Sequence, residues 1–337
     1  MMEIRSLGRT GIQVSPLCLG CMMFGGKTDP EESYRMIDAA LDAGINFLDT
    51  ANVYSRGRSE EVTGEALKRN GRRDRLVLAT KVYGRMDDDD PNAAGNSRRH
   101  IIQQCELSLK RLQTDWIDLY QIHRPQSDIP IDETLRALDD LIRAGKVRYA
   151  GTSTFAAWQV MESFWVSREL GLNRFVCEQP PYNLLDRRIE RELLPMARTY
   201  GMGVIPWSPL AGGLLTGKYR LDQEPPEDSR FDPLERNPYL DARYTRSALE
   251  AVEKLIPLAE GKGCTLSQLA VAWCLSQSGV TSPIIGPRTM RQLQDNLAAV
   301  EVTLDDSDRE RIDAACPPGR MISEFYTADF GPHRHRW

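Results

Sequence analysis

Four ionisable residues in this sequence stand where short apolar runs end, which is where buried strands deliver side chains to a common edge. Asp49 and Lys81 each end an apolar run, Tyr54 follows Asp49 by five residues, and His123 ends a third run. Each residue taken alone fits a structural role, such as a cap, a solvated lysine or a hydrogen-bonded core histidine. Three consecutive runs that end in this way favour one shared site.

Together these side chains suit proton transfer to a carbonyl oxygen. A carbonyl that becomes an alkoxide needs a proton and a stabiliser for the developing negative charge. A phenol supplies both, and a lysine ammonium beside a phenol lowers its ordinary pKa of about 10. Asp49 would hold Lys81 in an ion pair, and His123 would orient the carbonyl oxygen. None of the four residues can donate hydride, so a redox cofactor must supply it.

The segments that must position these residues alternate between short apolar runs and longer helical patterns. The expected strands cover residues 16–19, 46–49, 76–81, 116–123, 147–153, 174–179, 203–206 and 282–285. The expected helices cover residues 31–43, 59–68, 97–112, 131–143, 156–170, 189–200, 249–275, 290–299 and 307–315. Thr265 and Gln268 have the spacing of a capping box. Strands that alternate with helices are typical of parallel βαβ units.

Eight such strands favour an α/β fold of the (β/α)8 TIM-barrel type, with an N-terminal β-hairpin and extra C-terminal helices. We expect one domain over residues 1–337, because composition does not shift midway. A hairpin within residues 1–15 would plug the lower mouth of the barrel. Residues 220–244 form a long loop, of a length that is usually functional or disordered, and residues 317–337 form a C-terminal tail. In such barrels the active site lies at the carboxyl ends of the strands.

Composition narrows the partners and the compartment. The net charge is −5 and no basic block is present, which argues against nucleic acid or an anionic membrane as the main partner. No apolar run approaches the ~20 residues of a membrane span, and no secretory signal is visible, so we expect a cytoplasmic protein. The seven cysteines offer no complete metal site, and we expect no metal. The pair Cys18 and Cys21 has redox spacing, but Cys18 lies in a run expected to be buried. A homo-oligomer is compatible with these features.

Ordered motifs at successive strand ends resemble those of the aldo-keto reductase superfamily, in the NADP(H)-dependent branch of bacterial enzymes and potassium-channel β subunits. The segments that resemble its catalytic tetrad are residues 49–54, 80–81 and 121–123. Further stretches with the same resemblance are residues 20–25, 151–153, 178–185, 205–213 and 285–296. The resemblance extends over residues 3–316, and its motifs are specific because they occur in order along the chain.

The resemblance implies a (β/α)8 barrel that binds NADP(H) without a Rossmann fold, with Asp49, Tyr54, Lys81 and His123 as the tetrad. The positions that it assigns to the cofactor are Met22, Met23, Ser153, Thr154, Gln179, Trp207, Ser208, Pro209, Leu210, Gly212, Lys218, Gly286, Arg288, Gln292 and Asn296. Phe24 and Tyr83 follow strand ends and are assigned to the substrate pocket.

Within that set, the resemblance gives each part of the cofactor its own residues. Ser153 and Gln179 would hold the nicotinamide carboxamide, and Trp207 would stack on the nicotinamide ring. The pyrophosphate would lie along Ser208, Leu210 and Gly212. The adenosine 2′-phosphate and adenine would contact Arg288, Gln292 and Asn296, since the planar fork of arginine suits phosphate. Thr154 departs from the family, which usually has asparagine there, so carboxamide binding would depend more on Ser153 and Gln179.

The sequence thus predicts NADPH-dependent reduction of a small-molecule aldehyde or ketone to an alcohol, with Tyr54 as general acid. Two alternatives remain open. Lys81 could form a Schiff base in a lyase or aldolase, which requires a neutral lysine. The chain could also be a nucleotide-sensing regulatory subunit that acts through a partner protein.

Overall fold

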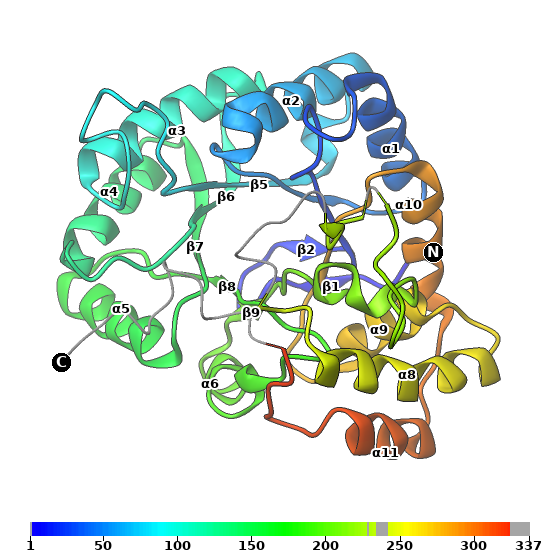
Figure 1. Cartoon of the computed structure of the whole chain (residues 1–337). Coiled ribbons are helices and arrows are strands. Elements are labelled where there is room, and N and C mark those ends of the chain that lie inside the picture. Colours follow the sequence, from blue (N-terminus) through cyan, green and yellow to red (C-terminus); the bar gives the residue numbers. More distant parts are fainter. Residues whose placement is uncertain (1, 228, 234–241, 324–337) are drawn as a thin grey trace.

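Eight parallel strands form the centre of the molecule (Figure 1). The computed structural model describes residues 2–227, 229–233 and 242–323. Within that part of the chain the strand order is β10-β3-β4-β5-β6-β7-β8-β9. The bounds are β3 (Cys18–Gly20), β4 (Phe47–Asp49), β5 (Val77–Val82), β6 (Ile117–Ile122), β7 (Val147–Ser153), β8 (Cys177–Gln179), β9 (Gly203–Val204) and β10 (Ile284–Ile285).

Hydrogen bonds between the two ends of this sheet close it into a barrel. The Thr281 amide donates to the Val204 carbonyl at 2.7 Å, and the Ile284 amide donates to the Pro206 carbonyl at 2.8 Å. On its other side β10 pairs in parallel with β3. The predicted (β/α)8 barrel is therefore confirmed.

Helices surround the strands as an outer ring (Figure 1). Their bounds are α1 (Pro30–Asp42), α2 (Arg58–Asn70), α3 (Arg98–Leu112), α4 (Ile131–Arg143), α5 (Ala157–Leu170), α6 (Leu193–Tyr200), α8 (Arg246–Gly261), α9 (Leu266–Ser276), α10 (Met290–Leu297) and α11 (Asp306–Ala315). The last two follow β10, as the sequence predicts. The main apolar core lies where these helices pack on the barrel. Among the described residues, no helix combines the length and apolar character needed to cross a bilayer.

The predicted helix over residues 249–275 is wrong, because two helices occupy this stretch. α8 ends at Gly261, and Gly263 then adopts a left-handed φ of 66°, which is costly for residues with a Cβ. α9 begins after Thr265, whose side chain accepts the Gln268 amide in the predicted capping box. Buried apolar residues continue through both helices, which is why the pattern looked unbroken. Residues 189–200 are likewise divided, into the 3-10 turn η3 (Arg188–Glu190) and α6.

The predicted N-terminal hairpin is present and closes the lower mouth of the barrel. β1 (Arg5–Ser6) pairs antiparallel with β2 (Gln13–Val14). Leu7 and Val14 are fully buried in a second apolar cluster with residues from the barrel interior, among them Phe47. The fit is close, since a Cβ on Gly203 would lie 2.9 Å from the Leu7 side chain. Of the two other predicted segments, residues 234–241 of the long loop and residues 324–337 of the tail lie outside the described part.

Candidate active site

Strands β4, β5 and β6 bring the predicted tetrad to one rim of the barrel. Asp49 lies opposite Ala79, and Lys81 lies opposite Gln121, in parallel register. Side chains alternate across a strand, so Ala79 and Lys81 face the same side, which is the barrel interior. Asp49 and Lys81 are 3% and 0% exposed. Two charged groups thus lie side by side, almost out of contact with water.

Lys81 makes three hydrogen bonds, one for each ammonium hydrogen. Its Nζ donates to Asp49 Oδ1 at 2.5 Å, to the Thr50 carbonyl at 2.8 Å and to Tyr54 Oη at 3.3 Å. Burial lowers the pKa of Lys81, but the charges and hydrogen bonds of Asp49 and Tyr54 outweigh that effect and raise it above its ordinary value. Lys81 is therefore a fixed cation at neutral pH.

Tyr54 opens a short 3-10 turn, η1 (Tyr54–Gly57), directly after the β4 end. The following residues, Ser55 and Arg56, have φ near 50°, which bends the chain back toward α2. The Tyr54 ring is half-buried, and its edge meets the His123 ring with centroids 5.6 Å apart. The phenol thus stands between the Lys81 ammonium and the His123 imidazole.

His123 lies one residue beyond β6, and its amide donates to the Val82 carbonyl at 2.9 Å. The side chain is partly exposed. Burial, then the nearby charges of Arg124 and Lys81, hold its pKa well below the ordinary value. The imidazole is therefore neutral near pH 7 and keeps one donor and one acceptor nitrogen.

A second buried network, which the sequence did not predict, occupies the other side of Asp49. Gln121 Nε2 donates to Asp49 Oδ2 at 2.9 Å, and Gln179 Nε2 donates to the same oxygen at 3.0 Å. Gln179 Nε2 also donates to Gln121 Oε1 at 3.0 Å. A period of two in β6 places Gln121 on the interior face with Leu119, and this was the available signal in the sequence.

The ends of β7 and β8 form the corner where the carboxamide was expected. Ser153 Oγ and the Thr154 amide both donate to the Gln179 carbonyl, at 2.9 and 3.1 Å. Thr154 has a left-handed φ of 62°. Its hydroxyl accepts a hydrogen bond from Arg124 Nη1 at 3.0 Å, and the same nitrogen donates to the His123 carbonyl at 2.7 Å.

Below this corner, Glu178 faces away from the barrel interior and is fully buried. Its Oε1 accepts the Phe155 amide at 3.0 Å, which ties β8 to the loop after β7. Burial raises the pKa of Glu178 to about 8, against smaller lowering effects that include the Phe155 hydrogen bond. The loop that carries Thr154 is thus supported by a carboxyl group that titrates near neutral pH.

Trp207 and the residues after it form the next part of the rim. The Trp207 amide donates to the Pro180 carbonyl at 2.9 Å, and the indole is half-buried. The chain then runs through Ser208, Pro209 and Leu210 into the 3-10 turn η4 (Ala211–Thr216). Gly212 has a φ of 69° there, and its open side faces the guanidinium of Arg230. Lys218 follows this turn and is exposed.

Guanidinium groups gather around this turn, and Arg230 is one that the sequence did not predict. Arg124 and Arg243 each lie 5.9 Å from the Trp207 ring. Burial, then the charges of Arg230 and Arg124, lowers the pKa of Arg243 to about 10. Burial and the charge of Arg288 outweigh Tyr219 and lower the pKa of Arg230. Cations that repel one another beside left-handed glycines fit a ligand that carries several phosphates.

The segment after β10 completes the rim. The Arg288 amide donates to Gln292 Oε1 at 2.7 Å, which orders the turn into α10. Thr28 Oγ1 donates to the Arg288 carbonyl at 3.0 Å and joins this turn to the loop after β3. Asn296 is buried on α10 and Gly286 is exposed. The charge of Arg288 influences Arg230, so both belong to one cationic area.

The remaining predicted residues follow β3 and β5. Met22 is 44% exposed, and Met23 and Tyr83 are partly exposed. Phe24 has no exposed surface and packs in the main core, so it lines no opening in this structure. Cys18 and Cys21 are also buried, and burial raises the pKa of both thiols.

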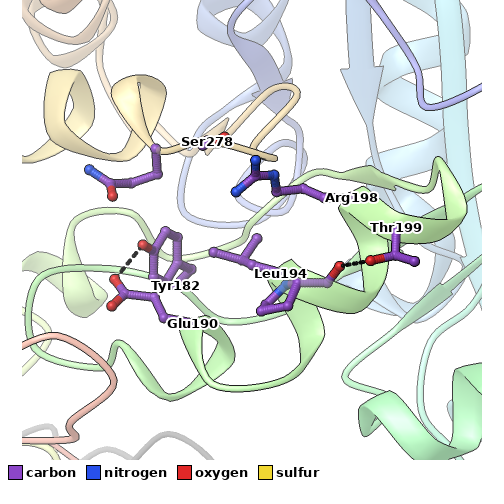
Figure 2. A pocket seen from close by; sticks show the side chains of 8 residues that line it. Tyr182, Glu190, Leu194, Arg198, Thr199 and Ser278 are labelled. Atoms are coloured by element: carbon purple, nitrogen blue, oxygen red, sulfur yellow. Dashed lines mark hydrogen bonds between the residues drawn. The ribbon is translucent and has the colours of Figure 1, made fainter.

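A surface cleft of about 590 Å³ contains none of the tetrad residues (Figure 2). It lies between α6 and the segment after α9, and Glu190 is its carboxylate. Glu190 Oε1 already accepts the Tyr182 hydroxyl at 2.6 Å and Arg187 Nε at 2.7 Å, and its Oε2 accepts the Gly319 amide at 2.9 Å. These bonds give Glu190 a structural role, so the rim around Tyr54 remains the candidate site.

Comparisons with known proteins show the family of this chain. The model of the aldo/keto reductase family matches residues 16–316. The chain is 41% identical over 335 residues to an uncharacterized oxidoreductase, YrpG, of Bacillus subtilis (strain 168), with 96% of this chain and 99% of that protein covered. It is 40% and 39% identical over 304 residues to probable voltage-gated potassium channel β subunits of Oryza sativa subsp. japonica and Arabidopsis thaliana, with 89% of this chain and 92% of each relative covered. The resemblance seen in the sequence is confirmed, and the chain belongs to the aldo/keto reductase family.

Proposed function

We propose that this chain reduces an aldehyde or ketone to an alcohol with NADPH and that Tyr54 donates the proton. The observation that carries the proposal is the set of three hydrogen bonds that Lys81 makes to Asp49, Thr50 and Tyr54. A buried cation beside a phenol stabilises the phenolate that remains after proton transfer. Family membership supports oxidoreduction in general.

NADPH, when bound, supplies the hydride that the side chains cannot. Ser153 and Gln179 would hold its carboxamide, Trp207 its ring, and Arg230 and Arg288 its phosphates. Tyr54 Oη gives its proton to the carbonyl oxygen, and the Lys81 ammonium, held by Asp49 and the Thr50 carbonyl, stabilises the phenolate. The neutral His123 donates a hydrogen bond to the carbonyl oxygen and fixes its orientation.

The first experiment is titration of NADPH and NADH into the purified protein with tryptophan fluorescence as the signal. We expect quenching at low NADPH concentration, weaker quenching with NADH, and loss of the signal in Trp207→Ala. Arg288→Ala should weaken NADPH far more than NADH, because the 2′-phosphate is present only in NADPH. Turnover of a panel of aldehydes then tests the reaction. No binding of either nucleotide would contradict the proposal.

The Schiff-base alternative is disfavoured by the surroundings of Lys81. An attacking lysine must be neutral, whereas the pairing with Asp49 keeps this one protonated. Borohydride treatment with a carbonyl substrate should therefore leave the protein mass unchanged. A covalent adduct on Lys81 would favour the alternative.

A regulatory role is the second candidate, and the relatives favour it. Two of them are described as probable voltage-gated potassium channel β subunits. A chain that serves mainly as a nucleotide-sensing subunit would bind NADPH tightly, turn over slowly and copurify with a partner. Fast turnover without a partner would exclude that role as the main one.

A further inference from the structure

Two buried glutamines connect the proton-donor group to the expected carboxamide corner. Gln121 lies on β6 and Gln179 on β8, and both amides contact Asp49 Oδ2. The other oxygen, Oδ1, pairs with Lys81. One carboxylate therefore holds the Lys81 ammonium on one side and the Gln179 amide on the other.

The Asp49 carboxylate determines which end of each amide faces it. A carboxylate only accepts hydrogen bonds, so the Gln121 and Gln179 nitrogens must point at it. Gln121 then presents its oxygen to the second hydrogen of Gln179 Nε2. A reversed Gln179 amide would place its oxygen against two acceptors in a buried setting, which is costly.

The network leaves one atom of Gln179 available to a ligand. Both hydrogens of Nε2 are used within the network, at 3.0 Å each. None of the described residues donates a hydrogen bond to Oε1. Oε1 is also not among the fully buried polar atoms that lack a partner, so part of its surface can be reached by a ligand. Gln179 therefore offers an acceptor to whatever binds at this corner.

We propose that Gln121 is a positioning residue that fixes the Gln179 amide with its oxygen toward the cofactor, so that the site selects a carboxamide able to donate an N–H. The inference rests on the proposed function, because it assumes that the nicotinamide end binds here. It deepens that function by making cofactor recognition depend on Asp49, which also holds the proton-donor group. Gln121 acts through Gln179 and touches neither substrate nor cofactor.

The test compares two ligands that differ only in this N–H. One is NADP⁺, and the other is its 3-acetylpyridine analogue, in which an acetyl group replaces the carboxamide and keeps only the acceptor. Their dissociation constants are measured by calorimetry on the full chain. Adenosine 2′,5′-bisphosphate, which lacks the nicotinamide, reports on the phosphate side. Gln104→Met is the matched control, because Gln104 is a buried glutamine bonded to Asn52 outside the network.

We expect the wild type and Gln104→Met to bind NADP⁺ about tenfold more tightly than the analogue. Gln121→Met should bind NADP⁺ less tightly and discriminate less between the two ligands, because Asp49 Oδ2 still attracts the Gln179 nitrogen but the second hydrogen of that nitrogen loses its acceptor. All three proteins should bind adenosine 2′,5′-bisphosphate equally, which shows that they are folded. Discrimination as strong in Gln121→Met as in the wild type would overturn the inference.

Gln121→Glu separates positioning from simple packing. A protonated glutamic acid can donate to Asp49 and accept from Gln179, as glutamine does, whereas its carboxylate cannot donate. Discrimination should therefore be stronger at about pH 6 than at about pH 9, since burial and a like charge raise the pKa of such a group. Equal discrimination at both pH values would contradict the inference. A wild type that binds NADP⁺ without discrimination overturns the inference alone, while one that binds no nucleotide overturns the proposed function.

Discussion

The proposed proton-donor side of the candidate site and its proposed phosphate side are held in place in different ways. On the first side, Asp49, Lys81 and Gln121 lie on strands, are almost completely buried and bond to one another. On the second side, Arg230 and Arg288 lie on loops, and burial together with the charge of Arg288 lowers the pKa of Arg230. The charges of the first side are already paired without a ligand, whereas a bound anion would relieve the repulsion on Arg230 at the second.

This difference predicts which properties a substitution on each side will change. A change among the strand residues removes interactions that exist in the free protein, so turnover and stability should both suffer. A change among the loop arginines removes interactions that are made with the ligand, so affinity should fall while the fold remains intact. Variants on the two sides therefore test whether turnover and stability depend on the strand residues and affinity on the loop arginines.

The largest effect is expected from Tyr54→Phe. Loss of a general acid typically lowers kcat by about 10²- to 10⁴-fold. Tyr54 is half-buried, and among the described residues its hydroxyl is hydrogen-bonded to Lys81 Nζ alone, so stability and NADPH affinity should change little. Steady-state kinetics with an aldehyde and a fluorescence titration with NADPH check both statements. Retained turnover would remove Tyr54 from its assigned role.

Lys81→Met should lower the free energy of unfolding by about 3–5 kcal/mol, because it leaves the buried Asp49 carboxylate without its cation. The double variant Lys81→Met, Asp49→Leu should recover part of this loss, since no charge is then left buried. Urea unfolding of the three proteins measures the difference. A loss below about 1 kcal/mol in the single variant would show that the Lys81–Asp49 pair contributes no more to stability than an exposed ion pair does.

Glu178→Gln should change the pH dependence of stability. The wild-type carboxyl has a pKa raised from 4.5 to about 8, mainly by burial. Between these values the folded chain holds a proton that the unfolded chain has released, so stability falls as the pH rises from about 4.5 to about 8. The glutamine variant should lack this fall, which is on the order of a few kcal/mol.

Urea unfolding at several pH values from 5 to 9 compares the two proteins, with the exposed Glu301→Gln as control. The control should follow the wild type throughout. Parallel pH curves for wild type and Glu178→Gln would mean that Glu178 is ionised in the folded chain.

Arg230→Met should weaken NADPH by about tenfold to a hundredfold and leave kcat at saturating cofactor nearly unchanged. The reason is that Arg230 lies beside Gly212 and feels the charge of Arg288, whereas the hydrogen bond to Tyr54 Oη comes from Lys81. Arg136→Met on α4, an exposed arginine paired with Asp132, is the control. A fall in kcat as large as the loss of affinity would break the distinction between the two sides.

The smallest effect is expected from Asp88→Asn. Its partner Arg56 follows Tyr54 by two residues, but both side chains are well exposed, at 66% and 73%. Exposed pairs contribute about 0–1 kcal/mol, so unfolding and turnover should be nearly those of the wild type. Loss of activity here would show that the η1 turn, and not only the strand ends, positions the phenol.

The strand side was the easier one to predict from the sequence. Asp49, Lys81 and His123 end apolar runs, and the ends of parallel strands meet at one rim. Gln121 was missed because a glutamine in a strand looks like a solvent-facing residue, although the period of two from Leu119 places it on the interior face. The contacts of Gln121 join β4, β6 and β8, which are distant in the sequence.

The loop side was harder for a physical reason. Arg230 lies in a stretch without regular structure, where neither period nor register indicates direction. The division between α8 and α9 was missed for the opposite reason, since buried residues on both helices continue one apolar pattern through Gly263. Gly261, Gly263 and the Thr265 cap indicate a break between two helices more strongly than the apolar pattern indicates one helix.

The hairpin that closes the lower mouth has a consequence for how the chain is made. Arg5 Nη1 donates to the carbonyl of Leu275 at 3.2 Å, a partner 270 residues away in the sequence. The hairpin can therefore complete this contact only after residue 275 has been synthesised. The apolar cluster around Leu7 is also complete only once Ile284 has been added, and chaperones can bind the incomplete cluster until then. Closure of the lower mouth of the barrel and pairing of β10 with β3 are therefore late events of synthesis. A chain that stops before residue 275 would lack both the completed apolar cluster and this strand pair.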